Sequence, residues 1–277
     1  MALEQHTITV AGRPRCTGWK PTPPDTITRL RDEGKIVLAS EHPALKAGPK
    51  ADWIEADCSH FWTKRLDQDG QGACVGFSAA HALQVALAKE GFADLHISPA
   101  AIYGAINGGY DDGANVGDSA DLLTKHGAFL DGTEGIGDLD WKKVWKSKWW
   151  QNPSSSLAVA AARYVVLEFV LCETIDEFTA ALKTGQWTGQ HCMGAGNNFD
   201  TDANGFLPKC DGTPINHALC TLGGAKQNPK TGEWCLQGAN SWSDWGLNQV
   251  FYFGLDWLDM PRQEMWLIRS TTLPEAP

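Results

Sequence analysis

The chain has 277 residues, of which 43% are hydrophobic and 20% are charged, and its formal net charge is −10. This composition is typical of a globular protein with enough apolar residues for one large domain or two lobes, and it excludes a disordered chain. The acidic balance argues against a nucleic-acid-binding protein, which usually carries a basic patch. No run of about 18 apolar residues is present, so we expect no membrane-spanning helix.

Residues 1–50 are rich in proline, glycine and lysine, and we expect them to form an extended N-terminal arm over the body of the protein. The three prolines between positions 21 and 24 argue against a helix there, because proline lacks the N–H donor and restricts the residue before it. We expect one short helix over 27–33 and a weakly alternating edge strand over 51–57.

Residues from about 68 to 150 are expected to form a helical lobe. Small residues predict a first helix over 74–90, and Ser98 is typical of the N-cap of a second. A third helix is expected over 118–126. The tryptophan- and lysine-rich stretch 141–150 predicts an amphipathic helix with its tryptophans turned inward.

A proline- and serine-rich linker over 152–156 is expected to lead into a β lobe over about 155–270. Thr174 and Glu177 have the spacing of a capping box, which predicts one helix within this lobe. The predicted strands cover 164–170, 187–193, 218–222, 234–238 and 250–253. A helical half followed by an antiparallel β half predicts an α+β fold, with residues 51–277 forming one two-lobed domain.

The first seven residues have neither a basic segment nor an apolar core, so we expect no secretory signal and a cytoplasmic protein with reduced thiols. A virion-associated location would follow if a phage encoded the chain. The eight cysteines contain no CxxC pair, and we expect neither a metal nor a cofactor. Whether Cys220 and Cys235, expected on neighbouring strands, form a disulfide in an oxidising compartment stays open.

Cys74 follows a glycine-rich turn and begins the first predicted helix. A thiol at this position lies among unpaired backbone N–H groups, at the positive end of the helix dipole. That setting favours the thiolate, which is the nucleophilic form of cysteine. We therefore interpret Cys74 as a catalytic nucleophile, although a lone cysteine in an alanine-rich helix is usually structural.

Two motifs in the β half supply polar groups that suit a cysteine nucleophile. His217 begins an apolar strand after a turn, and Asn240 ends another strand. The carbonyl of Asn240 can accept from one imidazole nitrogen and so direct the other nitrogen toward the thiol. Trp242 would shield that hydrogen bond from water.

Taken together, these motifs resemble the papain-like (C1 family) cysteine peptidases, in a bacterial or phage type without a long inhibitory propeptide. The resemblance covers about residues 50–270. Its motifs are Gln68 six positions before the cysteine, Cys-x-x-Phe-Ser at 74–78, Asn-His-Ala at 216–218, and Asn-Ser-Trp at 240–242 with Trp-Gly at 245–246. The spacing of the cysteine and histidine lies within the range of about 130–150 residues found in papain-type enzymes.

The resemblance implies a papain-like fold, in which an active-site cleft separates a helical left lobe from an antiparallel, barrel-like β lobe. It implies a cysteine endopeptidase that acts on a peptide or protein substrate. The implied catalytic residues are Cys74, His217, Asn240 and the oxyanion donor Gln68. The implied substrate-binding residues are Gly113, Ala114, Val116, Ala218 and Trp242.

The sequence departs from the family close to the nucleophile. Gln71 replaces a structural cysteine, so the family's disulfide at this position is absent, and Val75 replaces a tryptophan. We expect no regulation by a long helical propeptide, although the N-terminal arm could occlude the cleft. Two alternatives stay open, a peptide-binding or structural protein without turnover and a transamidase with the same triad. The sequence indicates neither the oligomeric state nor the natural substrate.

Overall fold

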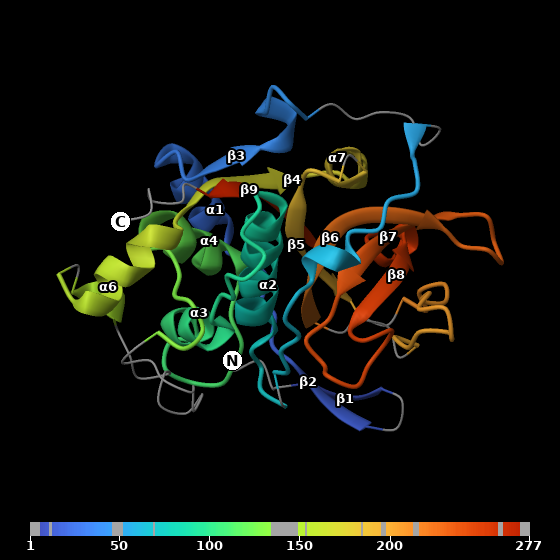
Figure 1. Cartoon of the computed structure of the whole chain (residues 1–277), viewed down its shortest axis with the longest axis horizontal. Coiled ribbons are helices and arrows are strands. Elements are labelled where there is room, and N and C mark those ends of the chain that lie inside the picture. Colours follow the sequence, from blue (N-terminus) through green and yellow to red (C-terminus); the bar gives the residue numbers. More distant parts are fainter. Residues whose placement is uncertain are drawn as a thin grey trace.

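The computed structural model describes residues 6–10, 13–45, 52–68, 70–133, 149–152, 154–183, 185–194, 198–212, 216–259 and 263–271. Within these ranges the chain forms a seven-stranded sheet, a separate two-stranded hairpin and several helices (Figure 1). The sheet is antiparallel except for one parallel pair at its edge. The predicted α+β class is therefore confirmed.

The seven-stranded sheet has the order β3, β4, β9, β5, β6, β7, β8. Its strands are β3 (Ile36–Leu38), β4 (Val166–Cys172), β5 (Thr188–Gly194), β6 (Asn216–Gln227), β7 (Trp234–Ala239), β8 (Val250–Gly254) and β9 (Glu264–Thr271). The strands predicted within β4 to β8 are confirmed, each with shifted ends. Strands β3 and β9 were not predicted.

Helix α2 (Cys74–Lys89) lies at the centre of the molecule, and all of its residues from Cys74 to Ala88 are buried. One side packs on β5, β6 and β9, and the other on α3 (Pro99–Ile106) and α4 (Val116–Lys125). Its five alanines and its one glycine, Gly76, permit this close packing. A Cβ at Gly76 would lie 2.6 Å from Cβ of Tyr103, so only glycine fits where α3 crosses.

Side-chain caps decide where several helices begin. The side chain of Ser98 accepts from the N–H of Ala101 and caps α3, as predicted. Asn115 accepts from Asp118 N–H, which starts α4 two residues earlier than expected. The predicted capping box is present at the start of α7 (Ile175–Leu182).

The junction between the two halves differs in part from its prediction. Ser155 caps a short helix that was not predicted, α6 (Ser156–Ala161), which begins at the last residue of the linker expected over 152–156. The helix predicted over 141–150 lies outside the described residues, apart from Trp149 and Trp150 in one turn of 3-10 helix.

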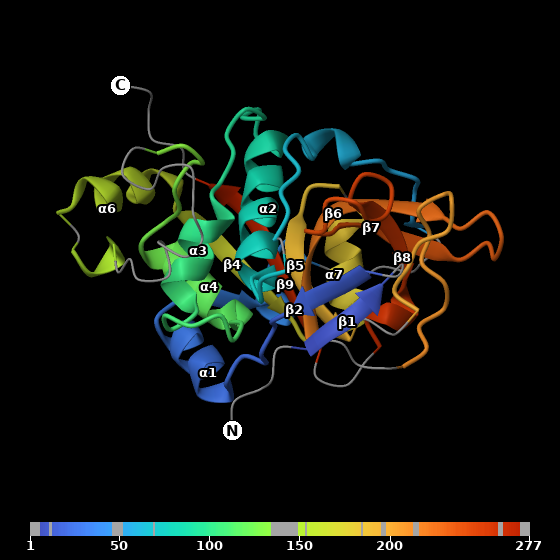
Figure 2. The same cartoon turned by 90° about the horizontal axis from the view of Figure 1, so that it is seen from below.

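The N-terminal arm contains the short helix expected over 27–33, which starts earlier as α1 (Pro24–Asp32), and two strands that the sequence did not indicate. Strands β1 (His6–Val10) and β2 (Arg13–Thr17) form the separate hairpin. Helix α1 (Pro24–Asp32) then leads to β3, and their residues Leu30 and Ile36 are buried in the core. Figure 2 shows the hairpin below β5 to β8 and α1 below α4, so the arm passes from one lobe to the other. The edge strand expected over 51–57 is reduced to a single bridge at Ala56.

All eight cysteines are free thiols. Cys220 lies opposite Ala239 in the sheet, whereas Cys235 lies opposite Lys226, so the register separates the two sulfurs. Among the described residues, no helix combines the length and apolar character needed to cross a bilayer.

Candidate active site

His217 and Asn240 form a hydrogen-bonded pair between the start of β6 and the end of β7. The distance from Nε2 of His217 to Oδ1 of Asn240 is 2.9 Å. Ser241 N–H donates to the same oxygen at 2.8 Å, which identifies it as the carbonyl oxygen. Nε2 of His217 therefore carries the proton, and Nδ1 of the neutral ring is an unprotonated base. Nδ1 is buried and has no hydrogen-bond partner among the described residues.

Trp242 covers the imidazole. The two rings are stacked, with centroids 4.6 Å apart and an interplanar angle of 14°. Phe199 packs edge-on against both rings. Because His217 and Asn240 are both 0% exposed, their hydrogen bond is shielded from water.

Gln68 is held by Ser241, the residue after Asn240. Gln68 N–H donates to the Ser241 carbonyl at 2.9 Å, and the Ser241 hydroxyl donates to Oε1 of Gln68 at 2.5 Å. These bonds fix the side-chain oxygen and turn the amide NH₂ toward two carbonyls, of Gln71 at 2.7 Å and Cys16 at 3.1 Å. Ser241 thus connects the predicted oxyanion donor to the His217–Asn240 pair, a role the sequence reasoning missed.

Cys74 is the first residue of α2 and is 0% exposed. Burial raises the pKa of its thiol to about 11, although backbone hydrogen bonds from Ala218, Gly18 and Val75 oppose the shift. Burial likewise lowers the pKa of His217 to about 4, against the hydrogen bond with Asn240. In this conformation burial therefore opposes the thiolate that the helix N-terminus favours.

Residues 16–20 of the N-terminal arm cover Cys74 and cross the site from the end of strand β2 onward, with one isolated bridge between Trp19 and Ala114. Ala114 N–H donates to the Gly18 carbonyl at 2.8 Å, and Lys20 N–H donates to the Ala114 carbonyl at 2.8 Å. Trp19 N–H donates to the Asn216 carbonyl at 3.3 Å. The backbone of the predicted substrate loop, Gly113–Ala114, is therefore engaged by the chain itself.

Glycines allow this close approach. A Cβ on Gly18 would lie 2.0 Å from the Gly72 carbonyl oxygen, and one on Gly113 would lie 1.8 Å from the Gly18 carbonyl oxygen. Gly113 also has a φ of +82°, which glycine adopts at low cost.

The crossing segment is anchored on the β lobe through the hairpin. Arg13 and Arg15 both form ion pairs with Asp244, which follows the Asn-Ser-Trp motif. The Arg15 guanidinium also lies 5.5 Å from the ring centroid of Trp242, a cation–π contact.

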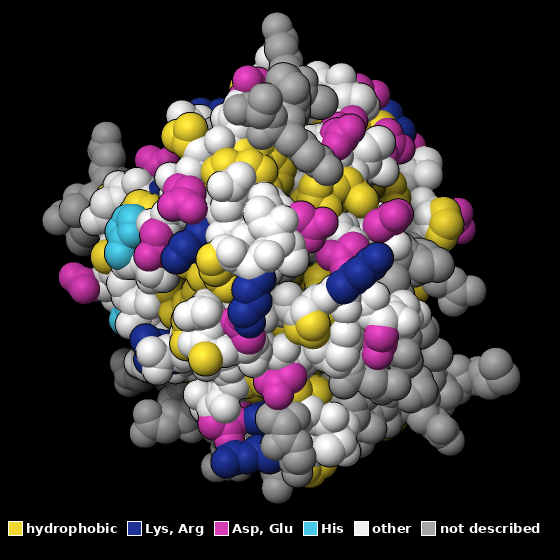
Figure 3. Space-filling model, turned by 90° about the vertical axis from the view of Figure 1, so that its right-hand side faces the viewer, with side chains coloured by type: hydrophobic (Ala, Val, Ile, Leu, Met, Phe, Trp, Pro, Cys, Tyr) yellow, Lys and Arg dark blue, Asp and Glu magenta, His cyan; other side chains and the backbone are white. Residues whose placement is uncertain are grey.

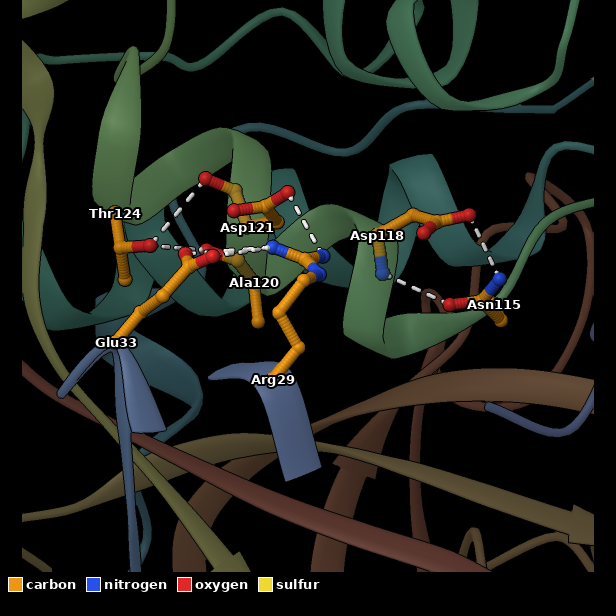
Figure 4. Close-up of polar contacts among 7 residues, drawn as sticks. All are labelled: Arg29, Glu33, Asn115, Asp118, Ala120, Asp121 and Thr124. Carbon is orange, nitrogen blue, oxygen red and sulfur yellow. Dashed lines mark hydrogen bonds and ion pairs between the residues drawn. The ribbon is translucent and has the colours of Figure 1, made fainter. Parts of the chain in front are cut away.

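A second set of contacts anchors it on strand β9 and on helix α4. The Thr22 hydroxyl donates to Glu264 at 2.7 Å and accepts from Gly117 N–H at 3.0 Å. Arg29 of α1 then pairs with Asp121 of α4 at 3.1 Å, two turns along the helix from its Asn115 cap (Figure 4).

Val116 and Ala218, the proposed pocket residues, are both buried in the same apolar cluster as Cys74. The arm occupies the adjacent space, because a Cβ on Gly117 would lie 2.4 Å from the Thr22 methyl group. An open hollow of about 830 Å³ lies instead on the β lobe, between residues 200–209, 228–235 and 254–256. None of the four predicted catalytic residues lines this hollow.

The β-rich side of the molecule has a mixed surface. Acidic, basic and apolar side chains are interspersed there, with no single type dominating (Figure 3). Within the described ranges, no three His, Cys, Asp or Glu residues are grouped to hold a metal ion.

No protein-family profile and no curated protein matches this sequence. Solved structures do match it. Xylellain, a cysteine protease from Xylella fastidiosa, superposes with a TM-score of 0.57 and 18% identity over 92% of each chain. The bromelain protease from Ananas comosus, solved with the E64 inhibitor, has a TM-score of 0.56 and 15% identity, over 78% of this chain and 99% of that one.

The clostridial cysteine protease Cwp84 matches with a TM-score of 0.61 and 13% identity, over 80% of this chain and 59% of that one. The three matches have one architecture in common. This chain has the papain-like cysteine protease fold, with its Cys, His and Asn close together.

Proposed function

We propose that this protein is a cysteine endopeptidase that hydrolyses peptide bonds with Cys74, His217, Asn240 and Gln68. The observation that carries the proposal is the His217–Asn240 hydrogen bond, which leaves Nδ1 as the free base of a buried ring. Cys74 begins the central helix, and its thiol contacts the backbone of Ala218, the residue after His217. Gln68 directs its amide toward the main-chain carbonyl of Cys16. A base, a nucleophile and an oxyanion donor are the groups that acyl transfer needs.

In the proposed reaction, Nδ1 of His217 takes the Cys74 proton and the thiolate attacks the peptide carbonyl. The oxyanion accepts from the amide of Gln68 and from Cys74 N–H, each donor contributing about 3 kcal/mol. His217 then protonates the leaving amine as the C–N bond breaks, giving a thioester. Water attacks the thioester with His217 as the base, which releases the acid and restores the thiol.

We further propose that the described conformation is a latent form of the enzyme. The Cys16 carbonyl accepts the hydrogen bond from the Gln68 amide that an oxyanion would need, and Gly18 covers the thiol. Activity then requires that residues 16–20 leave the cleft. Cwp84 was solved after cleavage of a propeptide, and this chain would use a much shorter segment for the same purpose.

The proposal is tested by incubating the protein with an epoxide thiol inhibitor and locating the adduct by mass spectrometry, alongside a casein hydrolysis assay. We expect an adduct at Cys74 that disappears in His217→Ala, and casein cleavage that disappears in Cys74→Ala. Cys220→Ala is the matched control, because Cys220 is equally buried but lies within β6 away from His217. Absence of any adduct after the arm is opened would favour a binding protein, and an adduct without hydrolysis would favour a transamidase.

A further inference from the structure

One peptide group lies between the oxyanion donor and a carboxylate outside the proposed triad. The carbonyl of Gln71 accepts from Nε2 of Gln68 at 2.7 Å. The N–H of the same peptide group, on Gly72, donates to Oδ1 of Asp111 at 3.0 Å. Because a peptide group is planar, the contact with Asp111 sets the direction of the carbonyl that holds Gln68.

Tyr103 of α3 holds Asp111 in place. Its hydroxyl donates to Oδ1 of Asp111 at 2.6 Å and accepts from Gly113 N–H at 3.2 Å. Burial and the neighbouring Asp111 raise the pKa of Tyr103, so the hydroxyl keeps the proton that it donates. Tyr103 is 0% exposed and packs against α2 at Gly76, so its position is rigid.

These contacts hold the turn before Cys74 against the loop at residues 111–113, and no covalent bond joins the two segments. Position 71 is glutamine and every cysteine is a free thiol, so the turn before Cys74 has no disulfide. The space around the turn is also restricted. A Cβ on Gly72 would lie 3.3 Å from Oδ1 of Asp111 and 3.4 Å from the nitrogen of Gly113.

We propose that Asp111 and Tyr103 are positioning residues, which aim the Gln68 amide through the Gln71–Gly72 peptide and fix the substrate loop through Gly113. The inference rests on the proposed peptidase function and adds two residues that touch no substrate. The two effects act on different kinetic constants. Misdirection of Gln68 weakens oxyanion binding and lowers kcat, whereas loosening of Gly113 weakens substrate binding and raises KM.

The test compares Tyr103→Phe with a matched control, Tyr252→Phe. Tyr252 of β8 is also buried, and its hydroxyl accepts from Gln237 at 3.2 Å outside the site. Both changes are made in the full chain carrying Gly18→Ala, which we expect to open the cleft because a Cβ there would meet the Gly72 carbonyl. We expect Tyr103→Phe to lower kcat about 10- to 100-fold, as a displacement near 1 Å does, and to raise KM. Tyr252→Phe should change neither constant.

A double-mutant cycle separates positioning from general destabilisation. If Tyr103 acts through Gln68, Tyr103→Phe should lower kcat less than about 2-fold once Gln68→Ala has removed the amide. The rise in KM should persist, since it depends on Gly113. Asp111→Asn should keep most of the activity because its amide oxygen can accept both bonds, whereas Asp111→Leu should lose it. Additive losses of kcat from Tyr103→Phe and Gln68→Ala would overturn the proposal.

A second measurement does not depend on turnover. Amide hydrogen exchange at Gly72 and Gly113 should accelerate at least about 10-fold in Tyr103→Phe and stay unchanged in Tyr252→Phe. Unchanged exchange in both variants would overturn the positioning role, even in a folded protein. Absence of hydrolysis in a Gly18→Ala parent that is labelled at Cys74 would contradict the peptidase assignment alone, and the exchange rates would then decide the role of Tyr103.

Discussion

The amide nitrogen of Gln68, in the turn before α2, donates at 3.1 Å to the main-chain carbonyl of Cys16 in strand β2 of the N-terminal arm. The predicted oxyanion donor is thus occupied by a carbonyl of the same chain. Together with the contact of Gly18 with the Cys74 thiol, this hydrogen bond is the basis for the proposal that the site is closed in this conformation.

Gly18→Ala should open the cleft. The added Cβ would meet the Gly72 carbonyl oxygen at 2.0 Å, a clash with backbone that no side-chain rotation relieves. Overpacking of this kind costs about 1–3 kcal/mol, which is about 5- to 150-fold in the opening equilibrium. The rate of Cys74 labelling by the epoxide inhibitor should rise by that factor. Gly34→Ala is the control: it also adds backbone strain, at a φ of +67°, but its Cβ meets nothing within 4 Å and it lies between α1 and β3, outside residues 16–20. An equal rise there would refute the explanation.

Arg15→Ala should loosen the same segment from the hairpin side. It removes the ion pair with Asp244 and the contact with the Trp242 ring, together about 1–2 kcal/mol. Labelling of Cys74 should accelerate about 5- to 30-fold and respond less to added salt than in the parent chain. Arg31→Ala, which breaks an exposed pair with Glu41, should leave the rate unchanged. Equal rates in all three proteins would show that the hairpin does not hold the arm.

Asn240→Ala should lower kcat about 10- to 100-fold in the Gly18→Ala chain, since the imidazole loses the partner that fixes its tautomer and direction. KM should change little, because no substrate contact is removed. Asn228→Ala, in the turn between β6 and β7, serves as the control. Steady-state kinetics on a fluorogenic peptide checks this, and an unchanged kcat would remove Asn240 from the site.

Acid should unfold the protein through its buried histidines. Burial lowers the pKa to about 3 for His81, about 3 for His191 and about 4 for His217, whereas the unfolded value is about 6.5. Below pH 6.5 the unfolded chain binds protons that the folded chain does not, so the free energy of unfolding falls as the pH falls. Each histidine contributes about 1.4 kcal/mol per pH unit between its two pKa values.

Denaturant titrations between pH 6.5 and 4 measure that slope. His81→Phe should reduce the histidine contribution by about one third, whereas His60→Phe, at an exposed position, should not change it. An identical slope in His81→Phe and the parent would show that His81 does not drive acid unfolding.

Local signals in the sequence predicted the central helix, the Ser98 cap, the Thr174–Glu177 capping box and most strands of the sheet. Strands β3 and β9 escaped notice because their partner, β4, is distant in sequence and β3 has only three residues. The four catalytic candidates could be named because their motifs are local. Ser241, Tyr103 and Asp111 could not, since their roles depend on contacts between remote segments.

The local argument did not foresee the burial of Cys74, which raises the pKa of its thiol. A helix N-terminus favours a thiolate, but the carbonyl of Cys16 and the backbone of Gly18 come from more than fifty positions away. No pattern near Cys74 indicates that burial. The arm's glycine and proline content predicted an extended segment but not its path across the thiol.

The most direct measurement is hydrolysis of a fluorogenic peptide by three full chains, the parent, Gly18→Ala, and Gly18→Ala with Cys74→Ala. If the protein is a latent cysteine peptidase, the parent chain should hydrolyse the peptide slowly. The rate should rise about 5- to 150-fold with Gly18→Ala and should be lost when Cys74→Ala is added. Hydrolysis that survives the loss of Cys74, or a Gly18→Ala chain that labels at Cys74 yet cleaves no peptide, would contradict the account.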